Sequence, residues 1–467
     1  MIKRKKVNNS VQYVVDRFLC SSCGTCAGVC PESAIKMEID RYGIYTPVID
    51  QTKCDNCGIC IKVCPGHSFN YYDHYNRIQG NLPKHVALGA FKKCYVLHSK
   101  DQGILKISQS GGLVSTLLIY CLDNNLINGA VVSKWNPESP LEPLTYIARN
   151  RKEVLDAVGS KYNPVPAAQA ISELLQTDGR FAFVGVSCQI QGFRKAEKLF
   201  PSLEKKIVLY IGLHCLGVFT YHFHDQILYK IGVKRENLVK FRHRDKVWRG
   251  WPCDMHIIDK EGKAYDIDAR YSRLWPRPFF TSWRCQLCFD KANEYSDISC
   301  GDCRIPYMQK KFQKEGYDLK KGLSECVVRT ERGLTIINRI IHNKKIVAYE
   351  TDADAIASSI GVAGKKIGIS TFIKVAKLLR LGIPQYGVNF SMEILDKNLK
   401  WKLSKPWIIL SSSRYYFTFT MAKYKIVRKF FKHVPHRVFA ILDKFFRRRA
   451  DWSIYSGSSR IIRKMLK

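Results

Sequence analysis

No stretch of this 467-residue sequence approaches the roughly 18 to 20 consecutive apolar residues that a membrane-spanning helix needs. The first residues, MIKRKKVNNSVQYVV, also lack the apolar block of a signal peptide. Both absences argue against a membrane-spanning or secreted protein, so we expect a cytoplasmic one. Thiols stay reduced in that compartment. The 18 cysteines are therefore expected to be metal ligands, catalytic groups or buried apolar residues rather than a disulfide framework.

Acidic residues are also scarce. The chain has 40 Asp and Glu against 76 Lys and Arg, which gives a formal net charge of +36 at pH 7. A charge of this sign favours an anionic partner, which can be nucleic acid, an acidic lipid surface or a phosphorylated ligand. Composition does not choose among them. The hydrophobic content of 46% is sufficient for a core, and the length predicts roughly two to four domains.

Cysteine, by contrast, is abundant, and it occurs in two near-copies: CSSCGTCAGVCP at 20–31 and CDNCGICIKVCP at 54–65. The run C-x2-C-x2-C-x3-C-P is that of bacterial two-cluster ferredoxins, in which the last cysteine of each run binds the other cluster. Two 4Fe-4S clusters are therefore predicted, and their ligands are Cys20, Cys23, Cys26 and Cys64 for the first and Cys54, Cys57, Cys60 and Cys30 for the second. A pair of zinc sites is the alternative, but triplets followed by Cys-Pro fit zinc poorly.

The residues around these cysteines support the same interpretation. Gly24 and Gly58 are expected to let backbone N–H groups approach inorganic sulfide. The segment between the copies predicts a β-hairpin with its tip at residues 41–43. Clusters of this type transfer single electrons, so the chain must contain, or dock to, a group that uses them.

The rest of the chain predicts an α/β architecture. Residues 66–83 are polar, aromatic and rich in turn formers, and we expect them to be a linker. A helix is predicted from about Leu113 to Leu122, and short buried strands are predicted just before Cys188 and Cys215. The fold class is therefore α+β and α/β: a small ferredoxin-like two-cluster domain, a larger mixed α/β flavin-binding region and a basic helical tail.

A third metal site is predicted downstream, with two alternative ligand sets. Cys188 and Cys215 follow predicted strands, where open α/β sheets expose ligands. Thiols from three loops could close around a further cluster, and these are Cys188, Cys215, Cys285 and Cys288. The competing set has the spacing of a zinc ribbon and consists of Cys285, Cys288, Cys300 and Cys303. Local sequence leaves both open.

Five stretches in order carry a family resemblance: SQSGG (108–112), GSKY (159–162), VGVSCQIQGFRK (184–195), HCLGV (214–218) and RCQLCFDKANEYSDISCGD (284–302). Over roughly residues 85 to 345 the chain resembles the coenzyme F420 hydrogenase/dehydrogenase beta subunit family, which also includes flavin-dependent chlorophyll-derivative reductases. The resemblance implies FAD and a 4Fe-4S cluster in the α/β part. It also implies that Cys188, Cys215, Cys285 and Cys288 are the ligands, because they match the family's cysteines.

A flavin site is predicted from the same resemblance. Ser110, Gly111 and Gly112 precede a helix, so Ser110 can cap it while the glycines turn N–H groups toward an anion; a capped helix after a flexible turn is the plainer alternative. Lys161 would contact a phosphate, and Gln189 would bind the flavin ring unless it is merely solvated. No catalytic residue is assigned.

Two further histidine-bearing features have paired interpretations. His214, beside Cys215, either donates to a cluster or the flavin, or is a satisfied core residue. The basic segment 241–251, FRHRDKVWRGW, is either a solvated loop or the mouth of a site for an anionic substrate.

The C-terminal segment 414–467 combines basic residues with apolar ones at helical spacing. It predicts helices docked on the protein's own surface, or peripheral contact with an anionic membrane at its inner face. Nucleic acid is the least favoured partner, because no recognised binding fold accompanies the charge. The predicted division is 1–75 two-cluster domain, 76–90 linker, 91–180 and 181–345 the two parts of the beta subunit region, 346–413 an α/β extension and 414–467 the tail.

The predicted function is that of an iron–sulfur flavoprotein oxidoreductase. Flavin exchanges one or two electrons, so FAD would connect the clusters to an organic substrate or a deazaflavin coenzyme. The redox partner would be a protein or a small-molecule donor or acceptor. Members of the resembled family often occur beside surface-polysaccharide biosynthesis genes, which implies a role there. The alternative is a non-catalytic electron-transfer subunit that docks to a partner enzyme.

Overall fold

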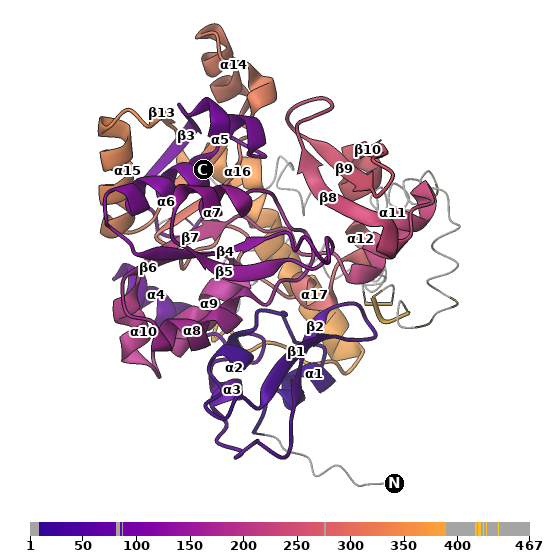
Figure 1. The fold of residues 1–467 in the computed structure, drawn as a ribbon. Coiled ribbons are helices and arrows are strands. Elements are labelled where there is room, and N and C mark those ends of the chain that lie inside the picture. The colour runs from indigo at the N-terminus through magenta and orange to yellow at the C-terminus, as the bar shows by residue number, and fades with distance from the viewer. Residues whose placement is uncertain are drawn as a thin grey trace.

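The computed structural model describes residues 9–80, 85, 87–274 and 277–388, and the isolated positions 416, 417, 419–421, 424, 426 and 438. Figure 1 shows a small cysteine-rich module at the bottom, a large sheet flanked by helices above it, and a second small sheet at one side. In the described part, no helix has the length and apolar character needed to span a bilayer. The fold is mixed α/β with a ferredoxin-like N-terminal module, as predicted.

The N-terminal module has pseudo-two-fold symmetry. Each cysteine repeat leads into one short helix, α2 (Thr25–Gly28) or α3 (Ile59–Lys62), and both helices begin after a glycine with positive φ, +86° at Gly24 and +72° at Gly58. The predicted hairpin between the repeats is confirmed: β1 (Ile35–Ile39) pairs antiparallel with β2 (Tyr45–Ile49). Helix α1 (Gln12–Asp16) precedes the first repeat.

The segment after the second repeat is not the irregular linker that we expected. It contains helix α4 (Tyr71–Gln79), which Asn70 caps by accepting a hydrogen bond from the backbone N–H of Asp73 and which Gly80 ends in the left-handed conformation. Tyr71 and Tyr75 are buried one turn apart. The aromatic residues that suggested a turn-rich linker are therefore one buried helix face.

The large sheet has eight strands in the order β13-β3-β12-β11-β7-β6-β4-β5. Its central strands β4, β6, β7 and β11 run parallel, and the outer strands pair antiparallel. The strands are β3 (Lys93–Ser99), β4 (Gly129–Lys134), β5 (Leu144–Ala148), β6 (Phe181–Val186), β7 (Ile207–Leu213), β11 (Ile298–Asp302), β12 (Ser324–Val328) and β13 (Ile346–Glu350).

Helices cover both faces of this sheet. The predicted helix is confirmed as α6 (Leu113–Asp123). The others described are α5 (Gln102–Ile107), α7 (Arg151–Asp156), α8 (Ile171–Gln176), α9 (Ser187–Ala196), α10 (Pro201–Lys206), α14 (Pro306–Lys314), α15 (Glu331–His342), α16 (Ala353–Ile360) and α17 (Val362–Leu378), with the 3-10 turns η1 (Ala167–Ala170) and η4 (Leu319–Lys321).

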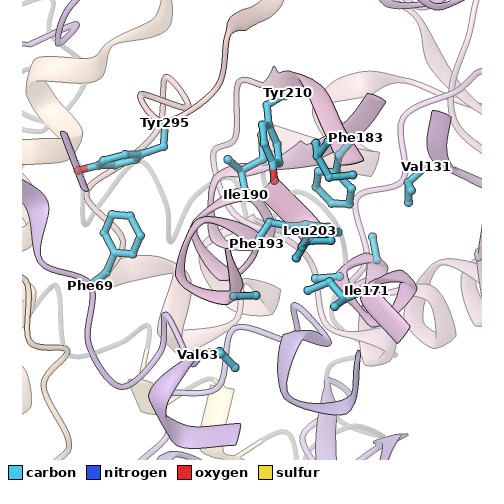
Figure 2. Packing of buried hydrophobic residues seen from close by; sticks show 14 of the residues in the cluster. Val63, Phe69, Val131, Ile171, Phe183, Ile190, Phe193, Leu203, Tyr210 and Tyr295 are labelled. Atoms are coloured by element: carbon cyan, nitrogen blue, oxygen red, sulfur yellow. The ribbon is translucent and has the colours of Figure 1, made fainter. Parts of the chain in front are cut away.

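The module and the α/β body share one hydrophobic core. Val29 and Val63 of the module belong to the same buried cluster as Ile190 and Phe193 of α9, and Figure 2 shows Val63 lying below these side chains. Glycine permits the close approach at Gly192, because a Cβ there would lie 2.0 Å from Oγ1 of Thr25. The module is therefore packed into the body rather than tethered to it.

The smaller sheet contains part of the basic segment. It has the order β10-β9-β8 and packs against α11 (Tyr221–Ile231) and α12 (Arg277–Phe280). Its strands are β8 (Leu238–Asp245), β9 (Asp254–Asp259) and β10 (Ala264–Ile267), with η2 (Arg235–Asn237), η3 (Arg270–Leu274) and α13 (Trp283–Gln286) nearby. A solvated loop is thus wrong for residues 241–245, where His243 and Arg244 are buried.

The predicted basic tail, 414–467, lies outside the described residues apart from its few isolated positions. Among these, Phe419 is buried, and its ring stacks on Tyr42 of the module with centroids 5.3 Å apart. The ring of Tyr416 meets Trp283 at 5.3 Å. At these two positions the chain packs against its own surface.

A buried histidine pair joins α11 to β8. Nε2 of His224 lies 2.9 Å from Nε2 of His243, and both side chains are fully buried. Burial lowers the pKa of His224 to about 3 and the pKa of His243 far below its usual range. Arg235 and Asp225 face His224, and the cations Arg273 and Lys161 face His243.

This pair predicts acid sensitivity of the smaller sheet. Below pH 6.5 the unfolded chain takes up protons on both histidines while the folded chain does not, so stability falls as the pH falls. Between pH 6.5 and 5.5 this pair should contribute a drop of about 2 kcal/mol to the free energy of unfolding. Urea unfolding followed by tryptophan fluorescence measures the change, and the ring of Trp135 lies 5.4 Å from that of His243. His224→Gln should remove about half of the pair's contribution; an unchanged pH dependence contradicts the assignment.

Candidate metal centres and cofactor site

The first predicted cysteine set surrounds one pocket. Cys20 and Cys23 precede α2, Cys26 lies in it, and Cys64 follows α3; all four line the same pocket together with Gly24. Burial raises the pKa of Cys64 to about 11 and that of Cys20 still higher. Unbound thiols here would stay neutral, whereas metal coordination ionises them. The crossed arrangement, three sulfurs from one repeat and one from the other, fits a 4Fe-4S cluster.

The second predicted set lies closer to the solvent. Cys30 and Cys57 interact electrostatically, as do Cys60, Cys57 and Cys54. Cys57 is exposed and the other three thiols are partly exposed. The backbone N–H of Ala34 donates to Sγ of Cys30 over 3.3 Å. This set therefore has the access that electron exchange with an external partner requires.

The third set predicted from the resemblance is brought together by the body. Cys188 lies in the first turn of α9, after β6, and Cys215 follows β7. Cys285 lies in α13 and Cys288 follows it. Because β6 and β7 are parallel, their carboxyl ends meet at one edge of the sheet. The pKa of Cys188 is raised by burial and by Cys23, Cys288, Cys215 and Cys285. A Cβ added at Gly217, two residues after Cys215, would lie 3.1 Å from Cβ of Cys285, so the loops that carry Cys215 and Cys285 are in close contact.

The first and third sets are neighbours. Among the neighbouring thiols, Cys23 of the first set raises the pKa of Cys188 the most. Sγ of Cys188 lies 3.9 Å from the backbone oxygen of Ser21, which is inside the first repeat. The three groups of four thiols therefore lie in a row in space: the solvent-facing second set, then the first set, then the third set at the sheet edge.

The competing zinc-ribbon set is not assembled in the same way. Cys300 lies in β11 opposite Cys326 of β12, and Cys303 belongs to an apolar cluster with Met308 and Phe312. Burial raises the pKa of both thiols to about 12, with Glu325 and Asp302 as the interacting neighbours. Over the described ranges, no three His, Cys, Asp or Glu side chains are grouped to hold a single metal ion.

The glycine turn before α6 differs from expectation in one detail. Ser110 does not cap the helix: its hydroxyl donates to the backbone oxygen of Leu323 over 2.6 Å. The N-cap is Gly112, with φ +77° and no side-chain hydrogen bond to the first turn. The N–H of Gly111 donates to Oγ of Ser324 over 3.0 Å. Ser110 therefore fixes the turn to the body and leaves the helix end uncapped by side chains.

Lys161 and a second cation, Arg242, lie near this turn. Gln109, which precedes Ser110 in the turn, connects it to both chain segments: its Oε1 accepts from the N–H of Ser160 over 2.9 Å, and its Nε2 donates to the backbone oxygen of Arg244 over 3.2 Å. Nζ of Lys161 donates to the backbone oxygen of Ala157 over 2.6 Å, and Arg242 donates to that of Val158 over 2.6 Å.

Both cations of this site are short of negative charge. Burial, and then Arg242, lower the pKa of Lys161 well below its usual range. Within the described chain no carboxylate forms an ion pair with Lys161 or Arg242. Both side chains are half-buried, and Asp245 interacts with Arg242 without forming an ion pair. Cations withdrawn from water are normally paired with anions, and guanidinium and ammonium groups are the usual partners of phosphate. The site therefore fits the phosphate groups of a dinucleotide.

Two other predicted contacts are occupied within the protein. Oε1 of Gln189 accepts from the N–H of Val186 over 2.8 Å, and its Nε2 donates to the backbone oxygen of Val165 over 2.7 Å. The ring nitrogens of His214 lie 3.3 Å from Oε1 of Glu325 and 3.4 Å from Oγ of Ser299. Gln189 thus shapes the turn that carries Cys188, and His214 is hydrogen-bonded within the core.

Three cations lie near the cysteines, and the sequence analysis gave none of them a role beside a cluster, although Arg284 was a minor candidate for the flavin site. Lys365, on α17, donates to the backbone oxygen of Cys285 over 2.5 Å. Lys195 and Arg284 contact the chain just after the first set. Burial lowers the pKa of Lys195 to about 8, which leaves it charged at neutral pH, and Cys64 and Cys23 oppose that shift. No local pattern signals such residues, because their partners are distant in sequence.

Family models match most of the described chain. A model described as 4Fe-4S dicluster domain matches residues 19–67. The model of the N-terminal part of the coenzyme F420 hydrogenase/dehydrogenase beta subunit matches residues 94–172, and the model of its C-terminal part matches residues 178–354. These last two models together span more than half of the chain.

Several individual proteins are similar to the chain. The coenzyme F420 hydrogenase subunit beta of Methanosarcina barkeri is 27% identical over 302 residues, which are 62% of this chain and 89% of that protein. The coenzyme F420-dependent sulfite reductase of Methanocaldococcus jannaschii is 27% identical over 345 residues, 70% of this chain but 47% of that protein. A chain of the F420-reducing NiFe hydrogenase complex from Methanosarcina barkeri aligns with TM-score 0.48 and 21% identity, over 64% of this chain and 97% of that chain.

Proposed function

Because the chain belongs to the coenzyme F420 hydrogenase/dehydrogenase beta subunit family and carries a 4Fe-4S dicluster domain, we propose that it is an FAD-dependent oxidoreductase with three clusters. The family and the dicluster domain establish an iron–sulfur redox protein. The proposal adds the third cluster, the flavin and an organic substrate or deazaflavin coenzyme. One observation carries it: Cys188, Cys215, Cys285 and Cys288 gather at the sheet edge next to the first cysteine set.

Each group of residues has a part in this function. The partly exposed set around Cys57 would hold the cluster that exchanges electrons with a redox partner. The buried set around Cys64 would hold the cluster between it and the set around Cys188 at the edge of the large sheet. Lys161 and Arg242 would hold the phosphates of FAD. A bound flavin supplies the conversion between one-electron and two-electron transfer. A role in surface-polysaccharide biosynthesis, and membrane contact through 414–467, remain predictions that rest on resemblance and composition.

Anaerobic purification followed by iron and flavin analysis tests the proposal. Three 4Fe-4S clusters predict about twelve iron atoms per chain, together with one FAD released on denaturation. About eight iron atoms and no flavin would instead support the second candidate, a non-catalytic electron-transfer subunit. The exposed position of Cys57 is equally suited to that function, so the metal and flavin content decides between them.

A further inference from the structure

Two cations from different elements grip the chain directly after the first cysteine set. Nζ of Lys195, on α9, donates to the backbone oxygen of Cys64 over 3.0 Å and to the backbone oxygen and hydroxyl of Ser68 over 2.6 and 3.2 Å. Arg284, on α13, donates to the backbone oxygen of Pro65 over 3.2 Å. The two cations therefore bind consecutive carbonyl groups from the side of the α/β body.

Their position is between the first and third sets. Lys195 interacts with the thiols of Cys64 and Cys23 in the first set. Arg284 is one residue before Cys285 and interacts with Cys288 and Cys188 in the third set. Arg284 is only 3% exposed, and its Nε, which is buried, has no hydrogen-bond acceptor among the described residues. An N–H group in that state points to an acceptor that the polypeptide does not supply.

Neither cation has a carboxylate partner in the described ranges. Three other buried cations do have one: Arg194 pairs with Glu197 at 3.2 Å, Lys366 with Glu294 at 2.8 Å and Arg244 with Asp302 at 2.8 Å. The groups that interact with Lys195 are the thiols of the first set, which become negative on binding a cluster. Arg284 interacts with two thiols of the third set and with the hydroxyl of Tyr386, whose pKa burial raises so that it stays neutral. The counter-charge of this pair is therefore provided by the cysteine sets themselves.

We propose that Lys195 and Arg284 form a cationic bridge that raises the reduction potentials of the two inner clusters relative to the solvent-facing one. The inference rests on the proposed function only in that the cysteine sets hold clusters. When a cluster is reduced it gains one electron and one unit of negative charge. A fixed positive charge a few ångströms away stabilises that reduced form, and burial weakens the screening by water. Both residues are positioning residues that hold charge beside the clusters.

Redox titration of the anaerobically purified chain, followed by electron paramagnetic resonance, tests the bridge. Lys195→Gln removes the charge but keeps N–H donors for Ser68, and Arg284→Gln does the same for Pro65. In Lys195→Gln, the ratio of reduced to oxidised first cluster at a fixed potential should fall about tenfold, which is about 59 mV for a one-electron couple. The solvent-facing cluster should keep its potential.

Matched variants control for structural damage. Lys198→Gln removes a lysine three residues further on, which pairs with Asp73 at the surface, and should leave every potential unchanged. Lys195→Arg keeps the charge and should keep the potential. If Lys195→Gln loses iron, the potentials are measured in Arg284→Gln instead, because the Arg284 side chain donates to Pro65 and not to the backbone of a cysteine. The potential of the third cluster should then fall.

Two outcomes overturn the inference. If Lys195→Gln and Arg284→Gln both keep their full iron content and their reduction potentials are unchanged, the two cations do not tune the clusters. Loss of iron in both variants would make the pair a structural clamp. A wild-type chain with about eight iron atoms would refute the third cluster, and hence the proposed function, but would leave the effect of Lys195 on the first cluster open to the same titration.

Discussion

A Cys188→Ala chain is expected to lose about four of about twelve iron atoms and to keep those of the N-terminal module. Cys188 lies in the first turn of α9, after β6, and interacts with Cys215, Cys285 and Cys288, whereas the ligands of the other two sets come entirely from residues 20–64. A cubane that loses one thiolate is left with an iron site open to water. Reduction of a flavin by electrons entering at the module should therefore be abolished, while reduction of the module by dithionite should persist.

The matched control is Cys300→Ala. Cys300 belongs to the competing zinc-ribbon set but lies in β11 opposite Cys326, buried in the hydrophobic core. Its loss should leave iron content and electron transfer intact apart from a modest loss of stability, because only a small cavity is created. Iron analysis of both variants purified anaerobically decides the matter. A Cys300→Ala chain that loses iron while Cys188→Ala keeps it would show that the alternative set is the ligand set.

The sequence predicted the cysteine sets of the module because their ligands are encoded locally. Within each repeat the cysteines are two or three residues apart, so the loop that wraps a cluster is contained in one short segment. The crossed exchange of Cys30 and Cys64 follows from the repeat itself. The hairpin β1–β2 was predictable for the same reason, since its strands and its tip at Gly43 adjoin in sequence.

The third set could be approached only through topology and resemblance. Cys188 and Cys215 come from the ends of two parallel strands, and Cys285 arrives after the whole of the smaller sheet has intervened. Strand ends can be predicted from apolar runs, but which ends become adjacent depends on the strand order β11-β7-β6-β4. Spacing alone therefore left two sets open, and the assembled sheet brings one of them together.

Other errors arose where polar and aromatic composition was taken as a sign of solvent exposure. Helix α4 was interpreted as a linker although Tyr71 and Tyr75 mark a buried face. The basic segment 241–251 was interpreted as a solvated loop or the mouth of an anionic site, and the loop is wrong for its part in β8, where His243 and Arg244 are buried. In β8 the cause is tertiary: Arg244 is neutralised by Asp302 from β11, a partner that local sequence does not reveal. The interior of this body contains many cations, so its charge is a poor guide to its surface.

The close packing of the module on the body bears directly on electron transfer. A Cβ at Gly24 would lie 2.4 Å from the backbone oxygen of Pro166, and one at Gly28 would lie 2.6 Å from that of Ala168. The backbone N–H of Ala168 donates to the oxygen of Cys23 over 2.9 Å. The first cysteine set is thus packed directly against the sheet edge, so that electron transfer between clusters bound at the two sets, as we propose, would need no domain motion.

A Lys161→Met chain is expected to lose flavin while keeping its iron. The two cations of this site lack a carboxylate partner in the described chain, and a charge-assisted hydrogen bond to phosphate is worth roughly 1.5 to 3 kcal/mol. Removing it should weaken FAD binding by about 10-fold to 100-fold. The measurement is the FAD to iron ratio after anaerobic purification, followed by fluorescence titration of the flavin-free protein with FAD.

Lys152→Met is the matched control, because Lys152 is an exposed lysine on α7 in the same part of the chain. It should bind FAD as the unaltered chain does. Lys161→Arg should recover part of the affinity, since a guanidinium can also contact phosphate, and Arg242→Met should reproduce the loss because Arg242 lies beside Lys161. Undiminished FAD binding in both Lys161→Met and Arg242→Met would move the flavin away from this site, and the loop 108–112 would then be only the turn that fixes α6 to the sheet.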